Sequence, residues 1–402
     1  MMALSEPTLR EPVYEFDYVN DETLKHGVHE GYWKLKEAAP PIFWTPANGG
    51  HWVLNSGDAV NEVLLNPDAF TSRYVTIPAT TYTPVVIPVT SDPPEHGPYR
   101  KLLRPFFEPA AIKKLESKIV EWTNLLIDRI IADKRCEFVD AMSSRLPVSI
   151  FMELMGLPLE KFEVFRELVV RYFNAIIDMD ERARAADEIN GYLEDLVAAR
   201  RSDPQDDLIT KLLDAKLKQP DGEERHLDQD ELMSIAFTMF VAGLDTVANG
   251  LSFGMHYLAS DEALRQRILD NPECIKNLPD ELLRRFTVVN TRRYANYDVD
   301  VQGVTIRKGD AILIPTMMVG WEEKLNASPH DVSVDRGVPR HGGYGNGIHV
   351  CLGMHLARLE LRIFYRIWFE RIGHFTLADP DAVLEMRAGT VMALKRLELQ
   401  WE

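Results

Sequence analysis

Apolar residues recur three or four positions apart through most of residues 117–269, a spacing that places them on one face of an α-helix. The middle of the chain is therefore predicted to be mainly helical. Polar segments at 200–207 and 218–230 interrupt the pattern and are predicted to be loops. Asp228 or Asp230 is a plausible N-cap for a helix over about 230–260.

The two ends of the chain have a different character. Residues 1–50 contain five prolines and are predicted to be irregular. Short β-like runs follow at 51–54, 299–301, 304–306 and 311–314, and a long helix is predicted over about 352–372. The sequence shows no internal repeat and no break in composition. We therefore expect residues 1–402 to form one large domain, mainly α with small β-sheets.

The composition excludes several classes of protein. The chain has 402 residues, 46% of them hydrophobic, which rules out global disorder, and its net charge of −17 argues against a nucleic-acid binder. Its three scattered cysteines form no disulfide framework, which favours a reducing, cytoplasmic setting. We find no signal peptide and no run of about 18 apolar residues, so no membrane span is expected.

The most informative segment is Tyr344-x-x-Gly347-x-x-x-Cys351-x-Gly353. It places one cysteine between glycines at the start of a predicted helix, where backbone N–H groups are expected to stabilise a thiolate and lower the thiol pKa. The glycines let the backbone approach something large and flat. A single cysteine is more often a buried apolar residue, and that alternative stays open on this segment alone.

This segment resembles the haem-binding signature of the cytochromes P450, with Tyr344 in place of the usual phenylalanine. The resemblance implies the cytochrome P450 fold enclosing haem b, with Cys351 as the axial ligand to iron and Tyr344 and Gly353 beside the cofactor. The tyrosine keeps an aromatic ring over the loop and adds a hydroxyl on the sulfur side.

A second motif lies within the helix predicted over 230–260. Gly243, Asp245 and Thr246 belong to the run Ala-Gly-Leu-Asp-Thr, and a threonine in mid-helix can bond the carbonyl four residues back and open a polar notch. The resemblance implies that Gly243 contacts the cofactor and that Asp245 and Thr246 deliver protons to iron-bound oxygen. The alternative is a threonine satisfied by its own helix and an aspartate that faces solvent.

Glu281 and Arg284 are three residues apart and share a helix face, which by itself indicates only a surface pair. In the family this pair is buried and is joined by an arginine that precedes the cysteine loop. Arg336 is the matching residue, and the role implied for all three is structural.

Haem carries two propionates that need cationic or donor partners once they are partly buried. The resemblance assigns His96, Arg100, Arg293 and His349 to them, with Arg292 as the substitute for Arg293 if the register differs by one. The alternatives are surface charges for the arginines and solvated rings for the histidines.

The chain resembles the soluble bacterial members of the family, which take electrons from a [2Fe-2S] ferredoxin supplied by an NADH-dependent reductase. The surface near the cysteine loop is therefore expected to offer positive charge to an acidic ferredoxin. Arg100, Lys101 and Arg104 are the candidates, and simple solvation is their alternative role.

Within the family, the runs 242–253, 280–293 and 392–401 resemble the bacterial camphor hydroxylase group. The position of that group's ketone-binding tyrosine falls on or near Pro84, two residues from Tyr82, and Thr76 replaces a bulky aromatic residue. We therefore expect a longer terpenoid or a norisoprenoid ketone rather than camphor. The pocket residues implied by the resemblance are mostly small, and the apolar ones are equally consistent with the core: Thr76, Thr238, Val241, Val289, Thr291, Thr390 and Val391.

The implied activity is a haem-thiolate monooxygenase that inserts one atom of O₂ into a small hydrophobic substrate. A thiolate-haem binding or sensor protein would share Cys351, but it has no need of the Asp245–Thr246 pair. A helical terpene cyclase would need an aspartate-rich DDxxD motif, which we do not find on a predicted helix.

Overall fold

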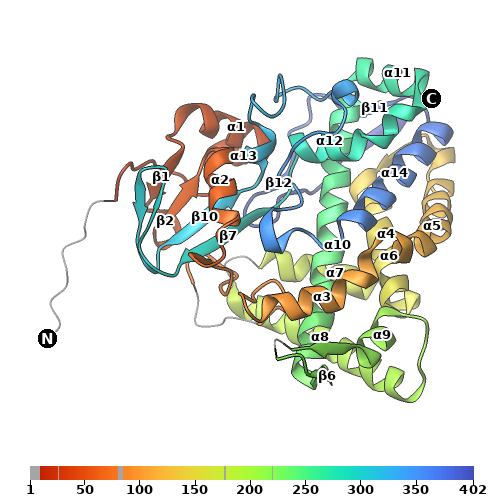
Figure 1. The fold of residues 1–402 in the computed structure, drawn as a ribbon. Helices are drawn as coiled ribbons and strands as arrows, with labels where there is room; N and C mark the ends of the chain where they lie inside the picture. The colour runs from red at the N-terminus through yellow and green to blue at the C-terminus, as the bar shows by residue number, and fades with distance from the viewer. Residues whose placement is uncertain (1–9, 26, 80–84, 176–177, 220) are drawn as a thin grey trace, which may run out of the picture.

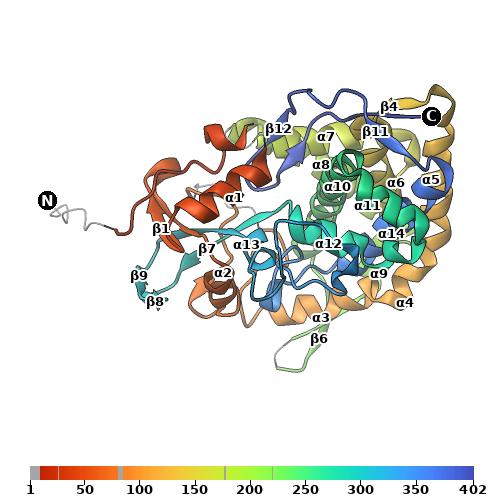
Figure 2. The ribbon, with the colours of Figure 1, turned by 90° about the horizontal axis from the view of Figure 1, so that it is seen from above.

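Helix α10 (Gln229–Ser260) is the long helix that runs through the helical part of the molecule (Figures 1 and 2). The computed structural model describes residues 10–25, 27–79, 85–175, 178–219 and 221–402. A capping box starts α10: Asp228 accepts the backbone N–H of Glu231, and the Glu231 carboxylate accepts that of Asp228. Among the described helices, α10 alone is long and apolar enough to cross a membrane, and 61% of its apolar window is buried inside the protein.

The other described helices flank α10 or cover the sheet. They are α1 (Val28–Ala38), α2 (Gly57–Leu64), α3 (His96–Phe107), α4 (Pro109–Ile112), α5 (Glu116–Asp128), α6 (Arg145–Met155), α7 (Phe162–Asn174), α8 (Met179–Ser202), α9 (Leu208–Asp214), α11 (Glu262–Asp270), α12 (Leu278–Arg285), α13 (Met317–Gly320) and α14 (Met354–Arg371).

The strands form one five-stranded sheet with the order β1-β2-β10-β7-β3 and several smaller sheets. In the main sheet only the β2–β10 pair is parallel, with Trp52 opposite Ile312. The described strands are β1 (Ile42–Thr45), β2 (His51–Leu54), β3 (Phe70–Thr71), β4 (Arg135–Glu137), β5 (Lys216–Lys218), β6 (Glu224–His226), β7 (Asn290–Ala295), β8 (Val299–Val301), β9 (Val304–Ile306), β10 (Ala311–Pro315), β11 (Phe375–Leu377), β12 (Met386–Arg387), β13 (Ala393–Leu394) and β14 (Glu398–Trp401).

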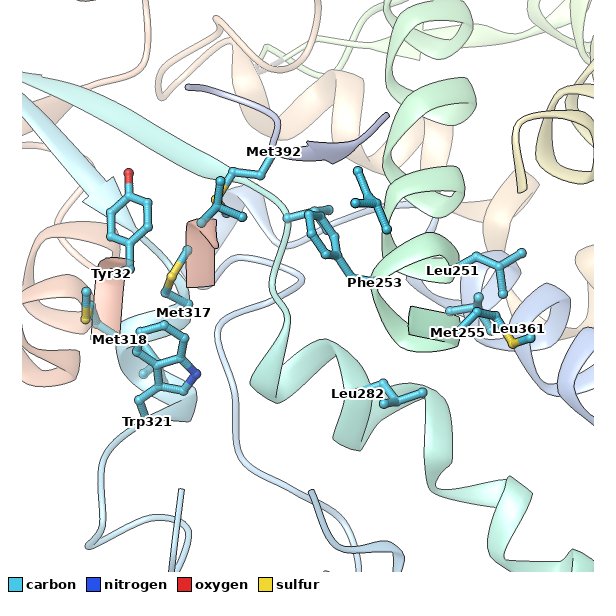
Figure 3. Packing of buried hydrophobic residues seen from close by; sticks show 14 of the residues in the cluster. Tyr32, Leu251, Phe253, Met255, Leu282, Met317, Met318, Trp321, Leu361 and Met392 are labelled. Carbon is cyan, nitrogen blue, oxygen red and sulfur yellow. The ribbon is translucent and has the colours of Figure 1, made fainter. Parts of the chain in front are cut away.

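The hydrophobic core joins the sheet to the helices across the C-terminal half of α10. Figure 3 shows Leu251 and Met255 of α10 beside Leu361 of α14, whereas Phe253 points the other way, toward Met392. A second cluster surrounds the N-terminal half of α10 and is formed with α6, α7 and α8. Both faces of α10 are thus buried, which holds this helix in a fixed position beside the cysteine loop.

The structure confirms the mainly helical prediction and most of the predicted elements. The predicted strands 51–54, 299–301 and 304–306 match β2, β8 and β9, and the long C-terminal helix is α14. The prediction that residues 1–50 are irregular is wrong, because they contain α1 and β1, and Tyr32 and Leu35 of α1 are buried. The predicted loop over 218–230 also contains strand β6, which pairs with β5.

Candidate active site

The cysteine loop is held by its own backbone just before α14. The Cys351 N–H donates to the Tyr344 carbonyl at 2.8 Å, which closes the loop into a tight turn. Gly347 has a φ of +67°, and a Cβ on it would lie 2.5 Å from the Leu64 carbonyl oxygen of α2. Glycine is therefore required at 347 both by conformation and by space.

The environment of the Cys351 sulfur combines burial with several positive or donor groups. Burial is the largest influence and raises the pKa of the thiol. The backbone N–H groups of Gly353 and Met354 and the charges of Arg100 and Arg358 act in the opposite direction. The predicted lowering of the thiol pKa is thus wrong for the chain without a metal, because desolvation outweighs the helix N-terminus. The same donors remain in place to stabilise a thiolate.

Tyr344 lies beneath this loop with its hydroxyl in the protein interior. Its ring packs under the guanidinium of Arg358, 4.5 Å from ring centroid to Cζ, and Arg358 in turn donates to Asp280 at 2.8 Å. Burial raises the pKa of Tyr344, and its hydroxyl oxygen has no hydrogen-bond partner among the described residues.

Cys351 is exposed to an internal space between α10 and α14. Two adjoining hollows, with volumes of about 220 Å³ and about 260 Å³, share Thr246, Arg293 and Cys351 among their lining residues. Tyr344 lines the first hollow and Gly353 the second. A sulfur thus faces a largely apolar space that reaches across to the middle of α10.

The middle of α10 presents small residues to this space. Ala242 is exposed although it lies halfway along a core helix, and Gly243 and Thr246 line the second hollow beside it. The Thr246 hydroxyl donates to the Ala242 carbonyl at 3.1 Å, a bond that both the predicted notch and the alternative of a threonine satisfied by its own helix require. A Cβ on Gly243 would lie 2.5 Å from the ring of Phe151, so this glycine also allows α6 to pack closely against α10.

Asp245 points away from the hollows. Its carboxylate forms an ion pair with Arg387 of β12, at 2.6 Å between Oδ2 and Nη2, and does not line either hollow. The alternative of an aspartate that faces solvent is thereby excluded, because its side chain is only 13% exposed.

Arg293 and Arg100 stand at the edge of the space, and neither has a carboxylate within 4 Å among the described residues. Arg293 donates to the Arg292 carbonyl at 2.7 Å, and Arg100 to the Val350 carbonyl at 2.6 Å. Burial lowers the pKa of both, to about 10 for Arg293, so each is a partly desolvated cation. Arg293 lines both hollows and Arg292 lines neither. This supports the sequence prediction of Arg293, rather than Arg292, as a propionate partner.

The two predicted histidines contact each other beside these arginines, with their rings tilted by 54°. The rings of His96 and His349 are 4.3 Å apart, and His349 bonds the Ser72 hydroxyl at 3.0 Å and lines both hollows. Burial lowers the pKa of His96 to about 4 and that of His349 to about 2, so both rings are neutral at pH 7. His96 lines neither hollow, and its Nε2 has no partner among the described residues.

The predicted structural charges form a buried network behind the cysteine loop. Arg284 donates twice to Glu281, at 2.9 Å each, and Arg336 donates to the same carboxylate at 3.1 Å. The backbone N–H of Ser333 adds a further bond at 2.9 Å. Glu281 and Arg284 are at most 1% exposed, so the alternative of a surface pair is excluded.

The predicted substrate residues are only partly brought together. Thr238 lines the second hollow, Val289 the first, and Thr291 both. Four others line neither hollow, namely Thr76, Val241, Thr390 and Val391. Val241 packs against the second hydrophobic cluster, and Val391 forms a β-bridge with Val289 from behind. Tyr82 and Pro84 lie outside the described residues.

Comparison with known proteins identifies the family. The family model for cytochrome P450 matches residues 149–377. A probable cytochrome P450 127A1 of Sinorhizobium fredii is 31% identical, over 91% of this chain and 88% of that protein. The chain belongs to the cytochrome P450 family. Its fold is similar to the crystal structures of CYP101J2 (TM-score 0.87, 32% identity, 97% of both chains) and CYP101C1 (TM-score 0.89, 29% identity, all of both chains).

Members of this family bind haem b with a thiolate ligand to iron, and this cytochrome P450 has the residues to hold it. Cys351 supplies a sulfur that opens into the hollows. Beside it, Arg100 and Arg293 supply two cations that have no carboxylate partner in the described part of the chain. A dianionic, flat, apolar group matches this arrangement, because its carboxylates can pair with the arginines while its ring fills the space above the sulfur.

Sequence reasoning missed two residues of this region. Arg387, the partner of Asp245, lies 142 positions further along the chain, and no periodicity indicates such a contact. Glu360 of α14 lines the second hollow and is only 4% exposed, and its Oε2 atom has no partner among the described residues. A glutamate in a helix ordinarily indicates a solvated face, so no sequence pattern marks Glu360 as buried.

Proposed function

We propose that this cytochrome P450 is a monooxygenase in which Cys351 ligates the haem iron and a small hydrophobic substrate occupies the remaining space against α10. The reaction is R–H + O₂ + 2e⁻ + 2H⁺ → R–OH + H₂O. The observation that carries the proposal is the position of Cys351, whose sulfur opens into a space bordered by Arg100 and Arg293. Haem, when bound, supplies the activation of O₂.

The protein's own residues would divide the remaining work. Arg100 and Arg293, assisted by His349 and His96, would bind the propionates. Glu281, Arg284 and Arg336 would keep the cysteine loop in place from behind. The hydrogen bonds to Glu281 and the lack of a carboxylate within 4 Å of Arg100 and Arg293 among the described residues support these assignments, whereas His96 would act through its ring contact with His349.

Thr246 and Asp245 would move protons toward the oxygen site. The Thr246 hydroxyl sits at the hollow and already bonds the Ala242 carbonyl at 3.1 Å, so it can accept a proton from one side and pass one to the other. Gly243 and Ala242 leave room for a small molecule beside it. A sensor protein has no use for such a pair, which makes turnover the better hypothesis than simple haem binding.

The proposed substrate is a terpenoid or norisoprenoid. The residues facing the hollow from the substrate side, Thr238, Val289 and Thr291, are small or medium in size, and the hydroxyl of Thr238 is already used by its own helix. With few free polar groups, the site would select its ligand by shape and hold a C–H bond in place by packing.

We further propose that electrons come from a [2Fe-2S] ferredoxin and its NADH-dependent reductase, in the cytoplasm. A surface hollow of about 470 Å³ reaches Cys351 from the side opposite α10, and its rim carries Arg100, Lys101 and Arg104. Glu108 pairs with Arg104 at 3.3 Å, so the patch is mainly but not wholly positive. An acidic ferredoxin matches this charge.

The test of Cys351 is the spectrum of the reduced protein with carbon monoxide. The wild type and Cys274→Ala, a change at a buried cysteine remote from the loop, should both show the red-shifted Soret band of thiolate-ligated haem. Cys351→Ser should lose it. A histidine-type spectrum in the wild type would refute the proposal.

The test of substrate and electron donor is separate. Camphor and a set of ionones are titrated while the low-to-high-spin shift of the haem is recorded, and product is then measured with ferredoxin, reductase and NADH. Ionones should shift the spin state more completely than camphor. A full shift with camphor and none with ionones would overturn the substrate assignment, and haem binding without any turnover would favour a sensor.

A further inference from the structure

The Asp245 carboxylate is held from outside its own helix. Arg387 of β12 donates to Asp245 Oδ2 at 2.6 Å, and the two side chains are only 11% and 13% exposed. Neighbouring residues of an α-helix point about 100° apart. While Thr246 faces the hollow, Asp245 is therefore turned toward the strand that carries Arg387.

Among the described residues, Arg387 also contacts the segment between β12 and β13, behind the pocket residue Val289, and helix α7. Its Nε donates to the Val391 carbonyl at 3.1 Å, and Val391 forms a β-bridge with Val289, which lines the first hollow. Its guanidinium also lies 5.8 Å from the ring centroid of Phe173, near the C-terminal end of α7. One side chain thus joins α10, the β12–β13 segment and α7.

Because the Asp245–Arg387 pair is buried, breaking it should cost more stability than breaking a surface ion pair. Exposed pairs contribute little, because water and salt screen them and both side chains are mobile. In a pair this far removed from solvent, loss of one partner leaves the other charge unpaired. Arg387 therefore restricts Asp245 to one orientation for as long as the β12–β13 wall keeps its position.

We propose that Arg387 is a positioning residue for Asp245. It fixes Asp245 beside Thr246 and links it mechanically to Val391, which pairs with the pocket residue Val289, and to Phe173 of α7. This inference rests on the proposed function, because it takes Asp245 as a proton donor. A substrate that displaces Val289, and with it Val391, or that displaces α7 then changes the position of the Asp245 carboxylate, so proton delivery is coupled to occupation of the site.

The first experiment measures coupling in the holoenzyme with its ferredoxin, reductase and NADH. Arg387→Gln should lower the product formed per NADH about threefold or more and raise H₂O₂, which takes both electrons and both protons without oxidising substrate. The Arg387→Gln change should also increase the solvent deuterium isotope effect on the rate of product formation. The ligand concentration that gives half of the spin-state shift should change little. Arg387→Lys keeps the charge but cannot also bond Val391, so it should restore only part of the coupling.

The matched control is Arg182→Gln. Arg182 of α8 lies over Tyr172 at 4.4 Å and donates to its hydroxyl at 3.2 Å, so it also holds α7, but it has no bond to Asp245. The control should retain the product per NADH of the wild type. If Arg182→Gln and Arg387→Gln gave the same loss, the effect would come from α7 alone and the proposal would be wrong.

The second experiment separates this proposal from the proposed function. In Asp245→Asn, the added Arg387→Gln change should cause no further loss of coupling, and the thermal midpoints of the ferric protein should also be non-additive. Additive effects would overturn the positioning role. Failure of the wild type to oxidise any tested ligand would refute the proposed function, yet the midpoints would still decide whether Arg387 holds Asp245.

Discussion

The two sides of the haem space are built on different principles. On the cysteine side, charges and glycines are fixed by specific contacts: Glu281 accepts four hydrogen bonds, and Gly347 has no room for a Cβ. On the substrate side, the lining residues are small, and hydroxyls such as that of Thr238 bond their own helix. The contacts of the cysteine side tolerate few other residues, whereas the small lining residues of the substrate side can be replaced in many ways. We therefore expect substitutions on the cysteine side to affect folding and those on the substrate side to affect ligand choice.

Glu281→Gln should give the largest loss of stability. The amide offers one acceptor oxygen instead of two and places an N–H₂ group against arginine donors, which leaves a buried guanidinium unpaired. We expect a loss of about 3–5 kcal/mol, together with loss of haem, measured by denaturant unfolding and by the absorbance of the Soret band.

The control for this change is Glu398→Gln, which removes the exposed partner of Arg396. Its cost should stay below about 1 kcal/mol. Equal costs for the two substitutions would show that the buried network has no special role, and the contrast between the two sides would fail.

Gly347→Ala should rank second. An alanine there needs φ of +67° and brings a Cβ within 2.5 Å of the Leu64 carbonyl oxygen. We expect a loss of about 2 kcal/mol or more. Gly303→Ala is the matched control, since φ is +83° and a Cβ meets nothing within 4 Å, so it carries the conformational cost alone. If both variants unfold at the same denaturant concentration, the tight contact with α2 contributes nothing.

This contrast also explains what the sequence could predict. The cysteine loop follows from the spacing of Gly347, Cys351 and Gly353, and local geometry requires the glycine at 347 by its φ of +67° and by space. Predicted elements such as the helix over 230–260 follow from periodicity. In contrast, the Asp245–Arg387 pair joins remote positions, and helix α1 lies among prolines and glycines that obscure its buried residues. Four predicted pocket residues, two threonines and two valines, lie outside the hollows because small residues of these types carry no signal of which side of the helix or strand faces the hollow.

Glu360→Gln tests an exception to the well-bonded charges of the cysteine side. Glu360 is a buried carboxyl whose Oε2 has no hydrogen-bond partner among the residues that the structure describes. Burial raises the pKa of Glu360 from an ordinary 4.5 to about 8, so the folded protein keeps its proton across a range where the unfolded chain releases it. Rising pH therefore favours unfolding between these two values, by up to about 1.4 kcal/mol per pH unit. The neutral amide removes this dependence.

The measurement is the free energy of unfolding of both proteins from about pH 5 to about pH 8. The wild type should lose stability relative to the Gln variant as the pH rises through this range. Parallel profiles would mean that the carboxyl is ionised in the folded protein and has found a partner.

Thr238→Val should have the smallest effect and is the sharpest test of the substrate side. The Thr238 hydroxyl donates to the Ser234 carbonyl at 2.7 Å, and valine keeps its shape, so the free energy of unfolding should change by less than about 1 kcal/mol. If ligands are selected by shape alone, the spin-state titration with an ionone should also be unchanged, whereas the bulkier Thr238→Phe should abolish that shift in a folded holoenzyme. A large loss of affinity in Thr238→Val would mean that the hydroxyl turns to the ligand, and that the substrate side also depends on a specific contact.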